Sequence, residues 1–176
     1  SLLLADVIAA DPPPGFSGET VIRAGDLSAR DEIDRLVAAR PDVIFHLAAI
    51  VSGEAEQDFD KGYRINMDGM RHLLESIRAA NAADGYLPRL VFTSSIAVFG
   101  APFPETIPED YFHTPLTSYG TQKEISELLL ADYSRKGFVD GIGIRLPTIC
   151  VRPGAPNKAA SGFFSSIIRE PLAGRE

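Results

Sequence analysis

The sequence predicts a protein of the α/β class, with a parallel β-sheet that helices wind around on both faces. Short apolar runs rich in β-branched residues alternate along the chain with longer segments of helical periodicity. The apolar runs are nearly continuous, as in strands that are buried on both faces. With 176 residues, 45% of them apolar, the chain is long enough for one domain with its own hydrophobic core.

Five apolar runs are predicted strands, at residues 2–5, 21–24, 43–47, 90–93 and 142–145. Four segments are predicted helices, at residues 28–40, 58–80, 118–136 and 160–168, the last of which ends near Pro171. Ser28 can cap the first helix and Pro41 ends it. Strands joined by helices form right-handed crossovers, so the sheet is expected to be parallel and doubly wound.

Ligands of such sheets bind beyond the carboxyl ends of the strands. The residues that follow the predicted strands are small, polar or acidic, and they include Asp6, Asp26, Ala48, Ala49, Ser94, Ser95, Pro147 and Thr148. A row of this kind suits a cleft for a dinucleotide.

Tyr119 and Lys123 are four residues apart in a predicted helix and therefore share one face of it. A lysine ammonium stabilises a nearby phenolate, whose ordinary pKa of about 10 is too high for a base at neutral pH. Taken alone, the pair is common on surface helices. Ser94 and Ser95 end the preceding strand, where a hydroxyl could hold a substrate oxygen, although serines at a strand end are also ordinary turn formers.

Asn66 and Gly69 lie inside the predicted helix 58–80, where both residue types are unfavourable. Their presence indicates close packing around the cleft, and a solvent-facing asparagine is the alternative. His46 ends a strand and is interpreted as a core histidine with its hydrogen bonds satisfied.

In this order and spacing, the segments resemble the short-chain dehydrogenase/reductase superfamily, in its extended, epimerase/dehydratase-like branch. The segments that match are His46 to Ala49, Asn66 with Gly69, Ser94 to Gly100, Tyr119 with Lys123, and Arg145 to Pro147. The resemblance covers essentially the whole chain and implies a Rossmann-type fold that binds NAD. It also implies that residues 1–176 are a partial NAD-binding domain, with the C-terminal substrate lobe largely absent.

The resemblance implies that Ser95, Tyr119 and Lys123 are the catalytic residues. Ser95 would orient the substrate hydroxyl, Tyr119 would take its proton, and Lys123 would hold the nicotinamide ribose and lower the pKa of Tyr119. Asp6 is expected at the adenosine ribose, which favours NAD over NADP. The cofactor-binding set is completed, besides Tyr119 and Lys123, by Asp26, Leu27, Ala48, Ala49, Asn66, Ser94, Pro147 and Ile149.

The sequence departs from the family pattern because it has no Gly-rich phosphate-binding loop ahead of Asp6. In the family's strand order, runs 2–5 and 43–47 are the second and fourth strands, and they flank a first strand that this sequence lacks. Such a sheet has two unpaired edges. We expect the sequence to be a segment of a longer protein, without about 30 residues that would precede Ser1.

Two strings, Arg145 to Gly154 and Asn157 to Phe164, look like those of the D-erythronate dehydrogenases. Enzymes of that group use NAD to oxidise the C2 hydroxyl of a four-carbon sugar acid to the 2-oxo acid. Such a substrate needs a cation for its carboxylate, and Arg152 and Lys158 are candidates, although a solvated basic loop would look the same. The other substrate-binding candidates are Ser52, Ser95, Tyr119, Thr148 and Asn157.

Two further functions stay open: a sugar-nucleotide epimerase or dehydratase that retains NAD, and a redox-sensing binding module with the same fold. The net charge of -7 argues against nucleic-acid and anionic-membrane partners, which leaves a small molecule. The single cysteine, Cys150, excludes an internal disulfide, and no metal site is expected. Without a signal peptide or a membrane span, the expected compartment is the cytoplasm. By resemblance alone, helices 58–80 and 118–136 could form a homodimer.

Overall fold

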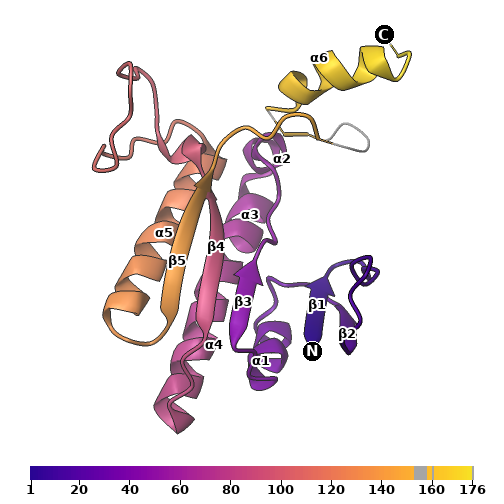
Figure 1. Cartoon of the computed structure of the whole chain (residues 1–176). Coiled ribbons are helices and arrows are strands. Elements are labelled where there is room, and N and C mark those ends of the chain that lie inside the picture. The colour runs from indigo at the N-terminus through magenta and orange to yellow at the C-terminus, as the bar shows by residue number, and fades with distance from the viewer. Residues whose placement is uncertain (153–157, 160, 176) are drawn as a thin grey trace.

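A computed structural model of the chain describes residues 1–152, 158–159 and 161–175 (Figure 1). Each predicted strand is present, as β1 (Leu2–Asp6), β2 (Thr20–Ala24), β3 (Val43–His46), β4 (Arg89–Ser95) and β5 (Asp140–Leu146). The strands pair in parallel and alternate with helices. The predicted fold class, α/β with a parallel sheet, is confirmed.

The strands form two separate sheets, with the orders β1-β2 and β3-β4-β5. Within the described residues, no strand joins β1 to β3, and Figure 1 shows the two sheets apart. This is the interruption that the sequence predicts between runs 2–5 and 43–47. It leaves β1 and β3 with one unpaired edge each.

Helices α1 (Arg30–Ala38) and α5 (Ser118–Arg135) correspond to predicted helices. The prediction that Ser28 caps α1 is wrong, because the N-cap is Ala29 and the Ser28 hydroxyl donates to Asp26 Oδ1 at 2.6 Å. The predicted helix 58–80 is present in three parts: α3 (Phe59–Gly62), the π-helical segment η1 (Tyr63–Asp68), and α4 (Gly69–Asp84). Helical periodicity alone did not predict this change of winding.

Two short elements, helix α2 (Ser52–Gln57) and the 3₁₀ turn η2 (Ile96–Val98), were too short to show a periodicity. The predicted helix 160–168 is α6 (Gly162–Leu172), which contains Pro171 and ends one residue after it, while residue 160 lies outside the described residues. In Figure 1, α6 and the segment between η2 and α5 extend beyond the carboxyl ends of the strands. Among the helices of the described residues, none is both long and apolar enough to cross a bilayer.

The hydrophobic core lies between β4 and the helices α1, α4 and α5. Its buried members include Ile33, Val37, Met70, Leu73, Leu74, Ile77, Leu90, Phe92 and Leu130. On β4 burial alternates, so that Leu90 and Phe92 face this core. The opposite face of β3-β4-β5 carries exposed apolar side chains, so within the described residues the helices cover one face of that sheet.

Candidate active site

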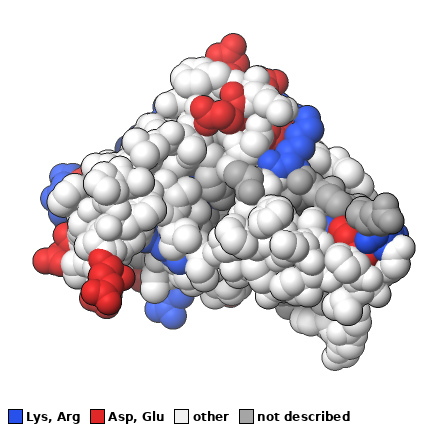
Figure 2. All heavy atoms as spheres, turned by 90° about the horizontal axis from the view of Figure 1, so that it is seen from above, with Lys and Arg blue, Asp and Glu red and all other residues white. Residues whose placement is uncertain are grey.

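The candidate residues gather at the carboxyl edge of the sheets. Asp6 ends β1, Ala48 and Ala49 follow β3, Ser95 ends β4, and Tyr119 is the second residue of α5. Figure 2 looks onto this edge from above and shows a largely uncharged face, on which charged side chains stand in small separate groups. A cluster of polar residues in uncharged surroundings is the usual character of a ligand site.

Tyr119 lies in the first turn of α5, where Thr117 is the N-cap and its Oγ1 accepts the amide of Gly120 at 3.0 Å. A Cβ on Gly120 would stand 2.2 Å from the carbonyl oxygen of Ala97 in η2. Glycine therefore lets α5 approach η2 closely. This approach brings Tyr119 close enough to Ser95 for the serine to act on the pKa of its hydroxyl.

Burial raises the pKa of the Tyr119 hydroxyl, while the hydrogen bond with Ser95 and the charge of Arg152 act in the opposite direction. The prediction that Lys123 lowers this pKa stays a prediction. The Lys123 Nζ stands 5.6 Å from the centroid of the Tyr119 ring, but Arg152 is the cation that favours the phenolate.

Lys123 is buried, with 3% of its surface exposed. Its Nζ donates to the carbonyl oxygen of Thr93 at 2.7 Å and lies 4.7 Å from the centroid of the Phe92 ring. Burial lowers the pKa of the Lys123 ammonium to about 8. The structure thus brings Ser95, Tyr119 and Lys123 together, with Lys123 close to its own titration at physiological pH.

His46 is buried at the end of β3 and stacks on Phe92 with ring centroids 5.9 Å apart. Burial, and then the charge of Lys123, lowers the pKa of His46 to about 4, so the ring is neutral at pH 7. Its assignment to the core is correct. The expectation that its hydrogen bonds are satisfied is wrong, because Nε2 has no partner among the described residues.

Two acidic candidates for the cofactor lie at the ends of β1 and β2. Asp6 is exposed, and its Oδ1 accepts the amide of Val7 at 2.6 Å. The carboxylate of Asp26 binds the Ser28 hydroxyl and also Arg64 Nη1 at 2.7 Å, and hydrogen bonds from Ser28 are the main cause of its lowered pKa. Asp26 therefore ties β2 to η1, whereas Asp6 offers its carboxylate to solvent. Leu27 is half-buried beside the core.

The candidates that follow β3 and end β4 differ in burial. Ala49 is exposed and Ala48 half-buried, which leaves a surface of small side chains. Asn66 is 2% exposed, and its side chain binds other parts of the protein. Ser94 is buried on the helix-facing side of β4, and its hydroxyl has no hydrogen-bond partner among the described residues. At the edge itself, Ser95 is half-buried, and its Oγ accepts the amide of Ala97 at 3.1 Å.

Arg152 is held by α6 through both its side chain and its backbone. Its Nη2 donates to Ser161 Oγ at 3.0 Å, its amide donates to Ser165 Oγ at 3.1 Å, and its carbonyl oxygen accepts Arg169 Nη1 at 2.7 Å. Ser165 is 1% exposed and also donates to the carbonyl oxygen of Ile149 at 3.2 Å. No feature of the sequence sets Ser165 apart from Ser161 and Ser166.

The other substrate candidates form a looser group. Lys158 is exposed, with its Nζ 3.4 Å from Gln57 Oε1, and its carbonyl oxygen accepts the amide of Gly53 at 3.1 Å. These contacts join the Lys158 segment to α2, which Ser52 opens. Thr148, like its neighbours Pro147 and Ile149, is exposed after β5, and Asn157 lies outside the described residues.

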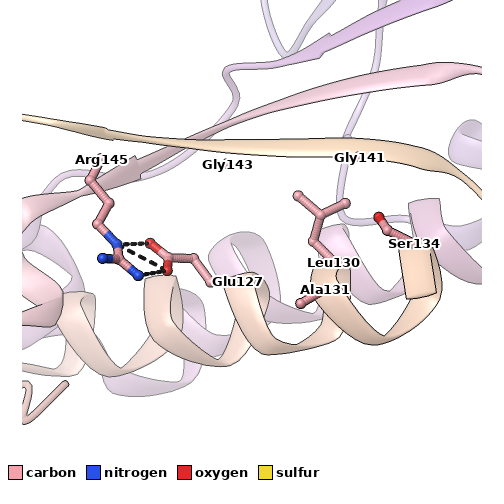
Figure 3. Close-up of a pocket in the computed structure, with 7 residues that line it drawn as sticks. All are labelled: Glu127, Leu130, Ala131, Ser134, Gly141, Gly143 and Arg145. Atoms are coloured by element: carbon pink, nitrogen blue, oxygen red, sulfur yellow. Dashed lines mark hydrogen bonds and ion pairs between the residues drawn. The ribbon is translucent and has the colours of Figure 1, made fainter. Parts of the chain in front are cut away.

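A groove of about 400 Å³ lies between α5 and β5, away from these residues (Figure 3). Its lining is Glu127, Leu130, Ala131, Ser134, Gly141, Gly143 and Arg145. Arg145 Nη2 holds Glu127 at 2.8 Å there. Glu127 also lies within 4.8 Å of His113 and Glu124, a possible metal-binding trio. We assign no metal, because Arg145 pairs with Glu127 and His113 Nδ1 lies 2.6 Å from Glu124.

The carboxyl edge fits a dinucleotide in three respects. Asp6 presents an exposed carboxylate suited to ribose hydroxyls. Ala48 and Ala49 provide small side chains against which a flat ring can lie. Lys123 supplies an ammonium 5.6 Å from the centroid of the Tyr119 ring. The fold and this Ser-Tyr-Lys arrangement define a member of the short-chain dehydrogenase/reductase superfamily, in its extended branch.

The chain belongs to the NAD dependent epimerase/dehydratase family, whose sequence model matches residues 5–176. It is 51% identical over 174 residues to D-erythronate dehydrogenase of Cupriavidus necator, covering 98% of this chain and 52% of that protein. It is 50% identical over 177 residues to D-erythronate dehydrogenase of Haemophilus influenzae, covering 99% of this chain and 54% of the relative.

Among solved structures, the chain is similar to one described as the nucleoside-diphosphate-sugar epimerase from Agrobacterium tumefaciens. The TM-score is 0.93 and the identity 71%, over 99% of this chain and 51% of that one. The chain thus spans about half the length of the relatives that it matches. The resemblance stated from the sequence is confirmed, and the family description names NAD as the cofactor.

Proposed function

We propose that the whole protein uses NAD to oxidise the C2 hydroxyl of a small sugar acid, D-erythronate, to the 2-oxo acid. The names of the two relatives at about 50% identity support this substrate class. The observation that carries the proposal is the position of Arg152, whose charge acts on the Tyr119 hydroxyl. A carboxylate bound by Arg152 would place the hydroxyl of the adjacent carbon next to Tyr119.

In the proposed reaction, Ser95 holds the C2 hydroxyl and the Tyr119 phenolate takes its proton. The C2–H bond breaks and its electron pair leaves with the hydrogen as hydride, while the C2–O bond becomes a carbonyl. NAD, when bound, supplies the hydride acceptor. Arg152 favours the phenolate form of Tyr119, and Lys123 would hold the nicotinamide ribose.

Steady-state kinetics of the whole protein test the proposal, with NAD, a panel of four-carbon sugar acids, and NADH absorbance as the readout. D-erythronate should give turnover, and Tyr119→Phe should reduce kcat by at least about 100-fold, because the base is lost. Turnover that survives Tyr119→Phe would exclude Tyr119 as the base.

Arg152→Ala tests the substrate site separately. Its KM for the acid should rise by about 10- to 100-fold, because a charge-assisted hydrogen bond to the carboxylate is lost. The pH at which kcat rises should also move upward, because Arg152 lowers the pKa of Tyr119. Arg71→Ala is the matched control, since Arg71 is an exposed arginine of α4 that faces Asp68 at 3.7 Å. An unchanged KM in Arg152→Ala would remove Arg152 from the substrate site.

The name of the 71% identical structure favours a second candidate function, that of a sugar-nucleotide epimerase. Such an enzyme keeps NAD bound and shows no net redox change. NAD that copurifies with the protein and does not wash out, together with no NADH from any acid, would support the epimerase and contradict the dehydrogenase.

A further inference from the structure

Gln122 is a fully buried polar residue of α5, next to Lys123 in the chain, that neither the motifs nor the proposed reaction uses. Its side chain reaches the π-helical segment η1, where Oε1 accepts a hydrogen bond from Asn66 Nδ2 at 2.8 Å. The amide nitrogen, Nε2, has no partner among the described residues. A buried amide with one unmet group costs stability, so packing alone does not explain a glutamine here.

Asn66 also binds the backbone of the segment that follows β3. Its Oδ1 accepts the amide of Ile50 at 2.9 Å, and its Nδ2 donates to the Ile50 carbonyl oxygen at 3.3 Å. Gln122 Oε1 takes the other Nδ2 hydrogen. The Ile50 amide and carbonyl set the orientation of the Asn66 amide, and Gln122 Oε1 holds the Asn66 side chain from the α5 side.

Gly62 of α3 and Ser126 of α5 lie beside the contact between Gln122 and η1. A Cβ on Gly62 would lie 2.6 Å from Gln122 Nε2, so glycine leaves the space that the glutamine occupies. Ser126, one turn along α5, has its hydroxyl 2.9 Å from the Gln122 carbonyl oxygen and 3.3 Å from that of Asn66. Ser126 thus joins α5 to η1 without a bond to the Asn66 side-chain amide, and it therefore serves as a control.

We propose that Gln122 is a positioning residue for the cofactor: acting through the Asn66 amide, it holds the backbone at Ile50 and thereby the Ala48–Ala49 surface. The proposal rests on the part of the proposed function that places NAD against these alanines. Gln122 itself touches neither cofactor nor substrate. Its effect is therefore expected in NAD affinity and not in the stability of the fold.

The test measures the dissociation constant of NAD by calorimetry and the thermal midpoint Tm, on the whole protein and three variants. Gln122→Met keeps the length and helix propensity of the side chain but removes the acceptor and the unpaired amide. Gln122→Glu keeps an acceptor oxygen for Asn66 and adds a buried carboxyl that lowers Tm. Ser126→Ala removes a buried hydroxyl of the same helix and leaves the Asn66 amide paired.

We expect Gln122→Met to weaken NAD binding about tenfold with a smaller fall in Tm than Gln122→Glu, since the variant removes the unpaired Nε2 while it leaves one Asn66 hydrogen without an acceptor. Gln122→Glu should have a lower Tm than the wild type and a dissociation constant for NAD within about twofold of it. Ser126→Ala should likewise lower Tm and keep the affinity for NAD within about twofold. If NAD affinity follows Tm across the variants, the role of Gln122 is structural and the proposal fails. If Gln122→Met does not fold, Gln122→Glu decides: retained affinity supports the proposal and lost affinity overturns it.

The readout separates this proposal from the proposed oxidation. A wild-type protein that binds NAD but oxidises none of the acids contradicts the oxidation alone, and the affinity comparison still decides the role of Gln122. A wild-type protein that binds no NAD overturns both.

Discussion

Acid should destabilise the folded protein through His46. The pKa of this buried imidazole is about 4 in the folded state, against an ordinary value of 6.5, because burial and the charge of Lys123 disfavour its protonated form. The unfolded chain takes up this proton near pH 6.5, whereas the folded chain takes it up only near pH 4. The contribution of His46 to stability is therefore complete above pH 6.5 and is lost as the pH falls towards 4.

The size of the effect follows from the difference between the two pKa values, 6.5 − 4 = 2.5. At 1.36 kcal/mol for each pKa unit, this corresponds to roughly 3 kcal/mol of unfolding free energy. Because a domain is stable by only about 5 to 15 kcal/mol, protonation of His46 alone removes a large share of the total.

Urea unfolding of the whole protein and of His46→Phe, at several pH values from 7 to 4, measures this contribution. Phenylalanine keeps an aromatic ring against Phe92 and cannot titrate. Carboxylates titrate in both proteins, so the difference between the two curves isolates His46. The wild type should lose roughly 3 kcal/mol more than the variant over this range. Parallel curves would refute the reasoning and show that His46 is solvated or paired in solution.

Three further substitutions test the site. Gly120→Ala should cost about 2 kcal/mol or more, seen as a lower Tm, because its Cβ would meet a carbonyl oxygen of η2, while Gly143→Ala, with open space around its Cβ, should not. Ser165→Ala should raise the KM for the acid about tenfold with kcat retained, because the Arg152 amide loses its partner, and an unchanged KM would contradict this. Asp6→Asn should shift the ratio of NAD to NADP use by about tenfold towards NADP in steady-state kinetics, and an unaltered ratio would place Asp6 away from the ribose.

Most of the fold could be predicted because its elements have strong local signals. The five apolar runs are strands in the structure, and the gap between β1 and β3 falls where the missing Gly-rich loop predicts it. The elements that were missed, α2 and η2, are shorter than the stretch of sequence over which a helical periodicity can be recognised. The cap of α1 was predicted wrongly because a serine can bond either to a helix amide or to a nearby carboxylate, and only the folded geometry decides between them.

The residues of the site could be predicted because their motifs follow one another along the chain in the order that the family shows. Ser95, Tyr119 and Lys123 are brought together, as the resemblance implies. The electrostatics were not predictable, because they depend on burial and on partners that are distant in sequence. The sequence did not reveal that the Lys123 ammonium donates to Thr93, or that the charge of Arg152 acts on Tyr119.

The π-helical segment η1 shows how a sequence signal can be correct while its structural meaning is not apparent. Asn66 and Gly69 both weaken an α-helix, which indicated something unusual at this point. In the structure, the amide of Gly69 bonds to the carbonyl oxygen of Arg64, five residues back, so the turn is wider than an α-turn. The wider winding leaves the Asn66 carbonyl oxygen in reach of the Ser126 hydroxyl, while the Asn66 side chain binds Ile50 and Gln122. The unfavourable residues are thus compensated by contacts with α5 and the segment after β3, and these contacts join the helix of Lys123 to the edge where the cofactor is expected.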